Sequence, residues 1–125
     1  MFTINKALIK IDIQLDNGVY YFDEESATGK TRLTKLLRGY MQDFPVSSYS
    51  YDDLVAGLDF NKVVKPGEQE FLVIDRYDLY KGRFTVQIEK FAKTGIVILD
   101  CKGDPLIPCE LCYLNMQDDK IEVYD

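Results

Sequence analysis

The sequence predicts one α/β domain over residues 1–125, with a mainly parallel central sheet and antiparallel hairpins at its edges. Two short and wholly apolar runs, Phe71–Ile74 and Ile96–Leu99, have the composition of strands that are buried on both faces. Segments in which apolar residues recur at helical spacing lie between predicted strands. Because a crossover between parallel strands needs a covering helix, this alternation favours a parallel sheet.

The N-terminal third predicts a hairpin, a loop and a helix. Residues Ala7–Leu15 alternate apolar and polar side chains, the turn sequence DNG follows at 16–18, and Val19–Phe22 is rich in strand formers. We therefore expect these two strands to pair as a β-hairpin. After the stretch DEESATGKT, apolar residues at helical spacing predict a helix over 30–41, although Gly39 lowers its helix propensity.

The rest of the chain predicts three further strands, two helices and an exposed loop around the two buried runs. Each assignment depends on the spacing of apolar residues, on turn residues or on a residue suited to a helix end. In chain order these elements are a weak strand over 46–51, a short helix over 53–58 that Asp52 caps, a loop over 61–69, a helix over 82–94, and a closing hairpin of strands 111–116 and 120–124.

Composition limits the classes of function. With 125 residues, of which 46% are hydrophobic, the chain is large enough to bury one core. A net charge of −6 disfavours direct nucleic-acid binding, because that affinity comes from lysines and arginines that neutralise phosphates. No apolar run approaches the roughly 20 residues of a membrane-spanning helix, and the N-terminus lacks a signal-peptide core. We therefore expect a cytoplasmic protein with no membrane partner.

The residues available for chemistry are restricted. The chain has no histidine, which excludes Ser-His and Cys-His nucleophile pairs and leaves carboxylates, lysines and bound cations. Cys109 and Cys112 have the Cys-x-x-Cys spacing of some zinc sites, but a tetrahedral zinc site takes four ligands and histidine is absent. We expect these residues and Cys101 to be small buried hydrophobic side chains without disulfides.

The segment Gly29-Lys30-Thr31 lies between a predicted strand and a predicted helix. In that setting backbone N–H groups and the helix N-terminus converge on a phosphate, a lysine reaches the outer phosphates, and a threonine hydroxyl ligates magnesium. The chain here resembles the P-loop nucleoside triphosphatases. The resemblance implies a bound nucleotide, ATP or GTP with Mg²⁺, whose phosphates contact Ser26, Ala27, Thr28, Gly29, Lys30 and Thr31.

A second segment supports the same resemblance. FLVID, at residues 71–75, looks like a Walker B segment, in which an acidic residue after a buried strand supports the magnesium shell. Thr31 and Asp75 are then the metal-site residues. The predicted hairpin before the loop is most similar to the branch that contains ABC-type and RecA-like ATPases. That branch implies a three-layer fold in which the Ile96 strand lies between the Val19 and Phe71 strands, with the Val46 and Leu111 strands on the two flanks.

Three features depart from the family pattern. Glu24 replaces the first glycine of the motif, and the acidic residues 23–25 bring negative charge to a site for a polyanion. Arg76 stands where many relatives place a water-polarising glutamate, which leaves Asp78 as the candidate catalytic residue. Alternatively, Arg76 forms an ion pair with Asp75 or with a loop acid. Hydrolysis is therefore expected to be weak or absent.

Two functions remain open. One is a small protein that binds a nucleoside triphosphate with Mg²⁺. The other is a nucleotide-free pseudo-ATPase that acts as an acidic protein-binding module, such as an adaptor or an inhibitor of the kind found in phages and mobile elements. Its partner would be a protein with a basic surface. The polar residues 100–102, which follow the second buried run, are interpreted as a turn in preference to a sensor-like strand tip.

Overall fold

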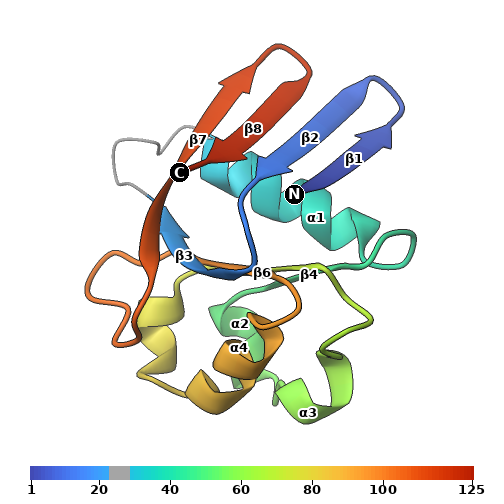
Figure 1. Ribbon diagram of the computed structural model, residues 1–125. Coiled ribbons are helices and arrows are strands. Elements are labelled where there is room, and N and C mark those ends of the chain that lie inside the picture. The colour runs from blue at the N-terminus through green and yellow to red at the C-terminus, as the bar shows by residue number, and fades with distance from the viewer. Residues whose placement is uncertain (23–28) are drawn as a thin grey trace.

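The computed structural model describes residues 1–22 and 29–125 (Figure 1). Within them the strands are β1 Phe2–Lys6, β2 Ile9–Gln14, β3 Gly18–Phe22, β4 Val46–Tyr49, β5 Phe71–Ile74, β6 Ile96–Leu99, β7 Glu110–Gln117 and β8 Lys120–Tyr124. The helices are α1 Lys30–Tyr40, α2 Tyr51–Val55, α3 Phe60–Val63, the 3₁₀ helix η2 Tyr77–Tyr80 and α4 Thr85–Phe91. The strands form one mixed sheet in the order β1-β2-β8-β7-β3-β6-β5-β4.

One part of this sheet is parallel. The strands β7, β3, β6, β5 and β4 pair with one another in parallel, and Val97 of β6 lies opposite both Val19 of β3 and Leu72 of β5. Their order confirms the predicted one, because β6 lies between β3 and β5 while β7 and β4 lie on the flanks. The carboxyl ends of these strands therefore lie along one edge of the sheet.

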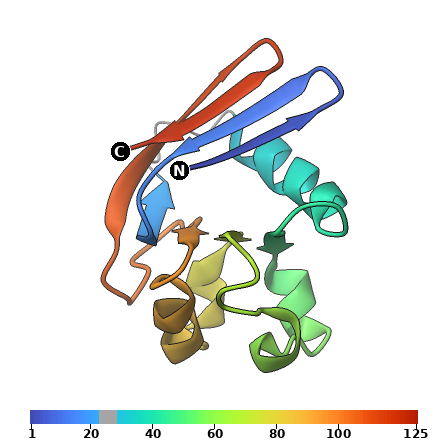
Figure 2. The same ribbon diagram turned by 45° about the vertical axis from the view of Figure 1, so that its right-hand side comes forward.

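The other part consists of two hairpins. The pairs β1–β2 and β7–β8 are antiparallel, and β8 lies parallel to β2 with Ile121 opposite Ile11. β7 belongs to both parts, because Glu110–Cys112 pair with β3 whereas Tyr113–Gln117 pair with β8. The sheet curls strongly, so that the two hairpins form a layer over α1 (Figure 2).

The predicted P-loop-type three-layer α/β fold is therefore wrong. In that class, helices cover both faces of a central sheet and hairpins only extend its edges. Here the hairpin strands make up half of one curled mixed sheet, and this sheet itself covers α1. The other helices in the described residues have seven residues or fewer. Apolar hairpin residues such as Ile11 pack against a helix, and their alternation alone does not reveal which layer they face.

The predicted hairpin between residues 7–15 and 19–22 is also wrong. Both strands exist, but β2 pairs with β1 and β8, while β3 pairs with β6 and β7. β1 was not predicted, and it joins β2 through a turn in which Ala7 adopts a left-handed backbone with φ 55°. After the sequence DNG the chain leaves the hairpin layer, and Gly18 N donates to Gly95 O at 3.2 Å beside β6.

Two hydrophobic cores lie on opposite faces of the parallel strands. Phe71 and Val73 of β5 face the core that contains α1 and the hairpins, whereas Leu72 and Ile74 face the core that contains α3, η2 and α4. All four residues are fully buried. This two-sided burial confirms the interpretation of the apolar runs as strands buried on both faces.

The structure confirms the predicted helices in part. α1 matches its prediction closely, and its apolar face buries Leu33, Leu37 and Tyr40. Ser50, and not Asp52, caps α2, because Ser50 forms a capping box with Asp53. α4 begins only at Thr85, after a left-handed Phe84, and the predicted loop over 61–69 contains most of α3.

Candidate functional site

The predicted site residues that the structure describes lie where α1 begins and where β5 and β6 end. Gly29 caps α1 with a right-handed backbone. A Cβ atom here would lie 3.0 Å from Leu114 Cδ2 and 3.1 Å from Met116 Cε, so glycine lets α1 begin close to β7. The predicted contacts Ser26, Ala27 and Thr28, and the acidic residues 23–25, lie outside the described residues.

Lys30 forms an ion pair with an acid that follows β6. Its Nζ atom lies 3.5 Å from Asp100 Oδ1 and 5.6 Å from the ring centroid of Phe22, the last residue of β3. The side chains of Lys30 and Asp100 are 13% and 17% exposed. The ammonium group is therefore held between the ends of two parallel strands, away from bulk solvent.

Asp75 and Asp100 extend neighbouring strands by one residue each. Asp75 N donates to Tyr49 O at 2.8 Å, and Asp100 N donates to Ile74 O at 2.9 Å. These backbone bonds place the two carboxyl groups side by side. Burial, followed by the interaction with the neighbouring Asp100 carboxyl group and its charge, raises the pKa of Asp75. The two carboxyl groups and Lys30 form one charged cluster at this edge.

Thr31 lies beside the cluster and lines a cavity of about 220 Å³ with Asp75. Thr34, Lys35 and Ser50 also contribute to its walls. Thr31 is exposed and is part of the first turn of α1. Hydroxyl and carboxylate oxygens are suitable ligands for Mg²⁺, which commonly takes one or two carboxylates and completes its shell with water and phosphate oxygens. The residues predicted for the metal, Thr31 and Asp75, are thus brought to one cavity.

Asp78 has a different set of partners. The Arg76 guanidinium donates two hydrogen bonds to its carboxylate, from Nε to Oδ1 at 3.1 Å and from Nη2 to Oδ2 at 2.9 Å. Lys102 N also donates to Oδ1 at 3.4 Å. The hydrogen bond from Arg76 is the main reason that the pKa of Asp78 is lowered. Of the ion pairs considered for Arg76, the pair with Asp75 does not form in the described residues, and the guanidinium binds Asp78 instead.

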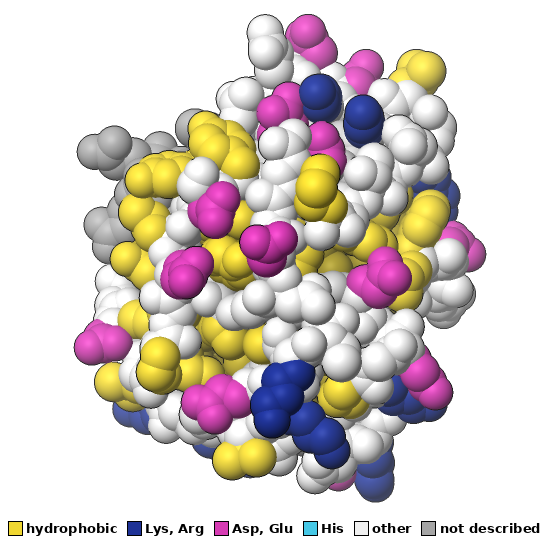
Figure 3. Space-filling model, viewed as in Figure 1, with side chains coloured by type: hydrophobic (Ala, Val, Ile, Leu, Met, Phe, Trp, Pro, Cys, Tyr) yellow, Lys and Arg dark blue, Asp and Glu magenta, His cyan; other side chains and the backbone are white. Residues whose placement is uncertain are grey.

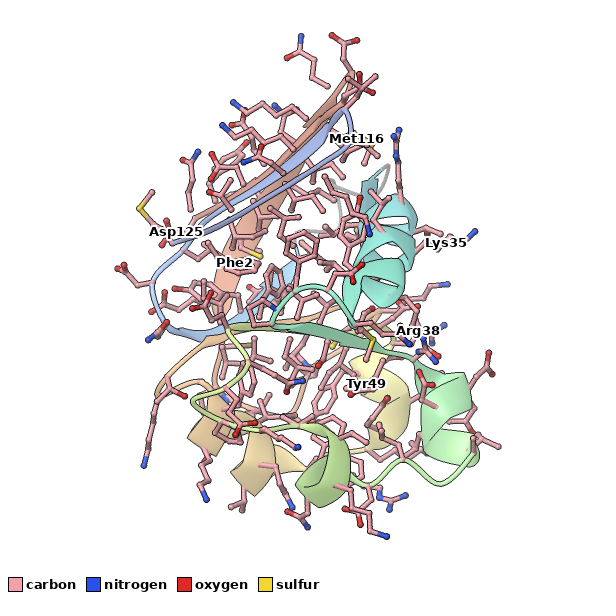
Figure 4. The ribbon with its side chains drawn as sticks, turned by 90° about the vertical axis from the view of Figure 1, so that its right-hand side faces the viewer. Phe2, Lys35, Arg38, Tyr49, Met116 and Asp125 are labelled. Carbon is pink, nitrogen blue, oxygen red and sulfur yellow. The ribbon has the colours of Figure 1, made fainter. Side chains whose placement is uncertain are left out.

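Three cations follow Lys30 along α1: Arg32, which is exposed, and Lys35 and Arg38, which point in different directions. Figure 4 shows Lys35 pointing away from the sheet, whereas Arg38 reaches towards α2. Arg38 pairs there with Asp53 and also donates to Ser48 O at 3.2 Å. Lys30 is therefore the cation of this helix that turns into the charged cluster.

Sequence reasoning missed the role of Asp100. The sequence favours a plain turn over residues 100–102, yet Asp100 contacts Lys30 and lies beside Asp75. A signal was present, because Asp75 and Asp100 each follow an apolar run of four residues. Adjacent parallel strands of equal length place such residues at the same edge, as the register of Ile74 opposite Leu99 shows.

Only one of the three cysteines has the buried position expected for all of them. All three are free thiols; Cys112 is buried, and Cys101 and Cys109 are half-buried. Burial raises the pKa of Cys112 to about 12, which keeps this thiol protonated at neutral pH. Among residues 1–22 and 29–125, no group of three or more cysteine and acidic side chains is arranged to hold a metal ion.

The surface charge is spread out. Figure 3 shows Asp and Glu side chains distributed over the viewed face, with Lys and Arg side chains between them and near one end. In the described part of the chain, no helix has the length and apolar character needed to cross a membrane.

Comparison with protein-family models, curated proteins and solved structures finds no match to this chain.

Proposed function

We propose that the protein binds a nucleoside triphosphate, ATP or GTP, with Mg²⁺ at the edge where β5 and β6 end and α1 begins. Hydrolysis is weak or absent. In this proposal Lys30 binds the outer phosphates, while Thr31 and Asp75 contribute to the magnesium shell. A cytoplasmic location, where these nucleotides and Mg²⁺ are both available, belongs to the same proposal.

The supporting observation is the meeting of Thr31 and Asp75 in one cavity, next to Lys30. Asp75 lies far from Thr31 in sequence, yet both line this cavity. The parallel pairing of β5 with β6 sets Asp75 beside Asp100, which is the ion-pair partner of Lys30. A threonine hydroxyl, a carboxylate and an ammonium group are the side chains that a phosphate-bound Mg²⁺ requires. The resemblance of GKT and FLVID to nucleotide-binding segments agrees with this arrangement.

Weak hydrolysis is supported by the state of Asp78. A general base is more effective when its pKa lies near the operating pH. Arg76 donates a hydrogen bond to each carboxylate oxygen of Asp78 and lowers the pKa of this carboxyl group, and Arg76 itself occupies the position directly after Asp75. Neither residue is therefore arranged as a general base.

The test is a titration of the protein with fluorescent ATP and GTP analogues in the presence of Mg²⁺. We expect saturable binding that weakens when Mg²⁺ is chelated. Lys30→Ala should weaken binding at least about tenfold, because a hydrogen bond to a charged phosphate is lost. Lys90→Ala is the matched control, since Lys90 is an exposed lysine on α4, and it should leave the affinity unchanged.

Two results would contradict the proposal. The first is no saturable binding at millimolar nucleotide by wild-type protein that circular dichroism shows to be folded. The second is binding that Lys30→Ala and Lys90→Ala affect equally, because the nucleotide would then lie elsewhere. A phosphate-release assay on the same samples measures hydrolysis.

The alternative function, a nucleotide-free acidic module that binds a basic protein surface, is favoured by one observation. Asp100 already neutralises Lys30, so the free protein offers a phosphate no uncompensated charge at this position. A folded wild type that fails to bind nucleotide, together with an Asp100→Asn variant that also fails, would favour this alternative.

A further inference from the structure

Asp100 is the carboxylate that holds Lys30 in the nucleotide-free protein. Within the described residues it is the only acid in ion-pair distance of Lys30 Nζ, at 3.5 Å. A phosphate bound by Lys30 competes for the same ammonium group. The ion pair and the proposed phosphate contact therefore exclude or weaken each other.

The two partners differ in freedom to move. Asp100 is fixed by its backbone, because its N–H donates to Ile74 O at 2.9 Å and its carbonyl accepts from Tyr77 N at 2.8 Å. Lys30 has a long side chain with four rotatable carbon–carbon bonds and lies in the first turn of α1. Lys30 is therefore the partner that can leave.

Burial of both side chains strengthens the attraction between Lys30 and Asp100. Both side chains are more than four-fifths buried, so water screens their attraction less than it screens an exposed pair. The ring of Phe22 covers the ammonium group from the side of β3. The position of Lys30 in the free protein is thus a defined state and not one of many solvent-exposed rotamers.

We propose that Asp100 is a latch that withholds Lys30 from phosphate until a nucleotide displaces it. The inference depends on the proposed function, because it regulates that same site. In the latched state Lys30 does not contribute to phosphate binding. The apparent affinity for nucleotide is then the intrinsic affinity reduced by the fraction of molecules in which Lys30 is free.

The test is Asp100→Asn, which removes the negative charge and keeps the shape of the side chain. If about nine-tenths of the molecules are latched, complete release raises the affinity for a fluorescent ATP analogue with Mg²⁺ about tenfold. Asp119→Asn is the control, because it removes the charge of an exposed residue in the β7–β8 turn. The control variant should bind as the wild type does.

A double-mutant comparison separates the latch from simple repulsion between Asp100 and phosphate. If Asp100 acts through Lys30, Asp100→Asn has no effect on affinity in a Lys30→Ala background. The latch is overturned if the substitution tightens binding equally in both backgrounds, or if it fails to tighten binding in the wild-type background.

A nucleotide-independent measurement tests the latch if the proposed function fails. The NMR signals of the Lys30 ε-methylene group should shift and show faster local motion in Asp100→Asn than in wild type. Unchanged signals overturn the latch whether or not nucleotide binds. If Asp100→Asn does not fold, Asp100→Ser removes the same charge with a smaller side chain and is measured in the same way.

Discussion

Arg38 and Asp53 join α1 to α2 through a two-pronged ion pair. Arg38 Nη2 donates to Asp53 Oδ1 at 2.6 Å, and Arg38 Nη1 donates to Asp53 Oδ2. The same carboxylate accepts a hydrogen bond from Ser50 N at 2.7 Å and so completes the capping box of α2. One side chain therefore fixes a helix end and links two helices that flank β4.

Asp53→Ala should destabilise the protein by about 1–2 kcal/mol, because it removes a helix cap and an ion pair together. Urea unfolding followed by circular dichroism measures the change. Asp52→Ala is the control, since Asp52 is an exposed acid in the first turn of the same helix and forms no side-chain hydrogen bond or ion pair in the described structure. A loss no larger than that of the control would show that the pair contributes little.

The stabilisation from Asp53 should depend on pH. The hydrogen bond from Arg38 is the main reason that the pKa of Asp53 is lower in the folded protein than its usual value. Its contribution is therefore present above the unfolded pKa of about 3.9 and is lost as pH falls through the lower folded value. The difference in unfolding free energy between wild type and Asp53→Asn should shrink between pH 5 and pH 2, roughly the interval over which such a carboxylate titrates. A constant difference would contradict this prediction.

Two glycines of α1 and its N-cap, neither of which has a positive φ, should respond in opposite ways to alanine. Gly39 lies inside α1, and a Cβ there would meet nothing within 4 Å, so Gly39→Ala should stabilise the protein by about 0.5–1 kcal/mol. Gly29→Ala forces its Cβ against Leu114 and Met116 and should destabilise the protein by about 1 kcal/mol. Thermal unfolding of the two variants provides the comparison. Equal shifts of the same sign would show that close packing at Gly29 is unimportant.

Tyr80→Phe should cost about 1 kcal/mol of unfolding free energy, because the phenol is fully buried and donates to Ser50 O at 2.7 Å. The substitution removes only the hydroxyl group, so packing of the ring is retained. Tyr113→Phe is the control, since no hydrogen bond from its hydroxyl forms in the described residues. Chemical unfolding of the two variants should separate them by about this amount, and identical midpoints would contradict the prediction.

The parallel strands could be predicted from the sequence because burial on both faces leaves a distinct pattern. Phe71–Ile74 and Ile96–Leu99 are apolar at every position, and each run supplies residues to both cores. The alternation of apolar and polar side chains over residues 7–15 was equally clear, but such alternation does not predict which strand pairs with this one. One partner is β1, and the other is β8, which lies more than 100 residues away in sequence. That long-range pairing is what overturned the predicted fold class.

The candidate site could be predicted only where a residue belonged to a local motif. Lys30 and Thr31 follow Gly29, and Asp75 ends FLVID, so sequence alone singled them out. Asp100 has no such motif, and its importance depends on a contact between α1 and the end of β6. The pairing of Arg76 with Asp78 depends on the left-handed backbone of Arg76, at φ 52°, which brings the guanidinium back over η2.

The pairing of β2 with β8 also sets an order of events during synthesis. β8 is made after every other strand of the sheet, yet it lies between β2 and β7. Until it emerges from the ribosome, β2 lacks its second neighbour and the cover over α1 is incomplete. In a nascent chain that has not yet made β8, one edge of β2 has no strand to pair with, and a chaperone or a second nascent chain has access to that edge.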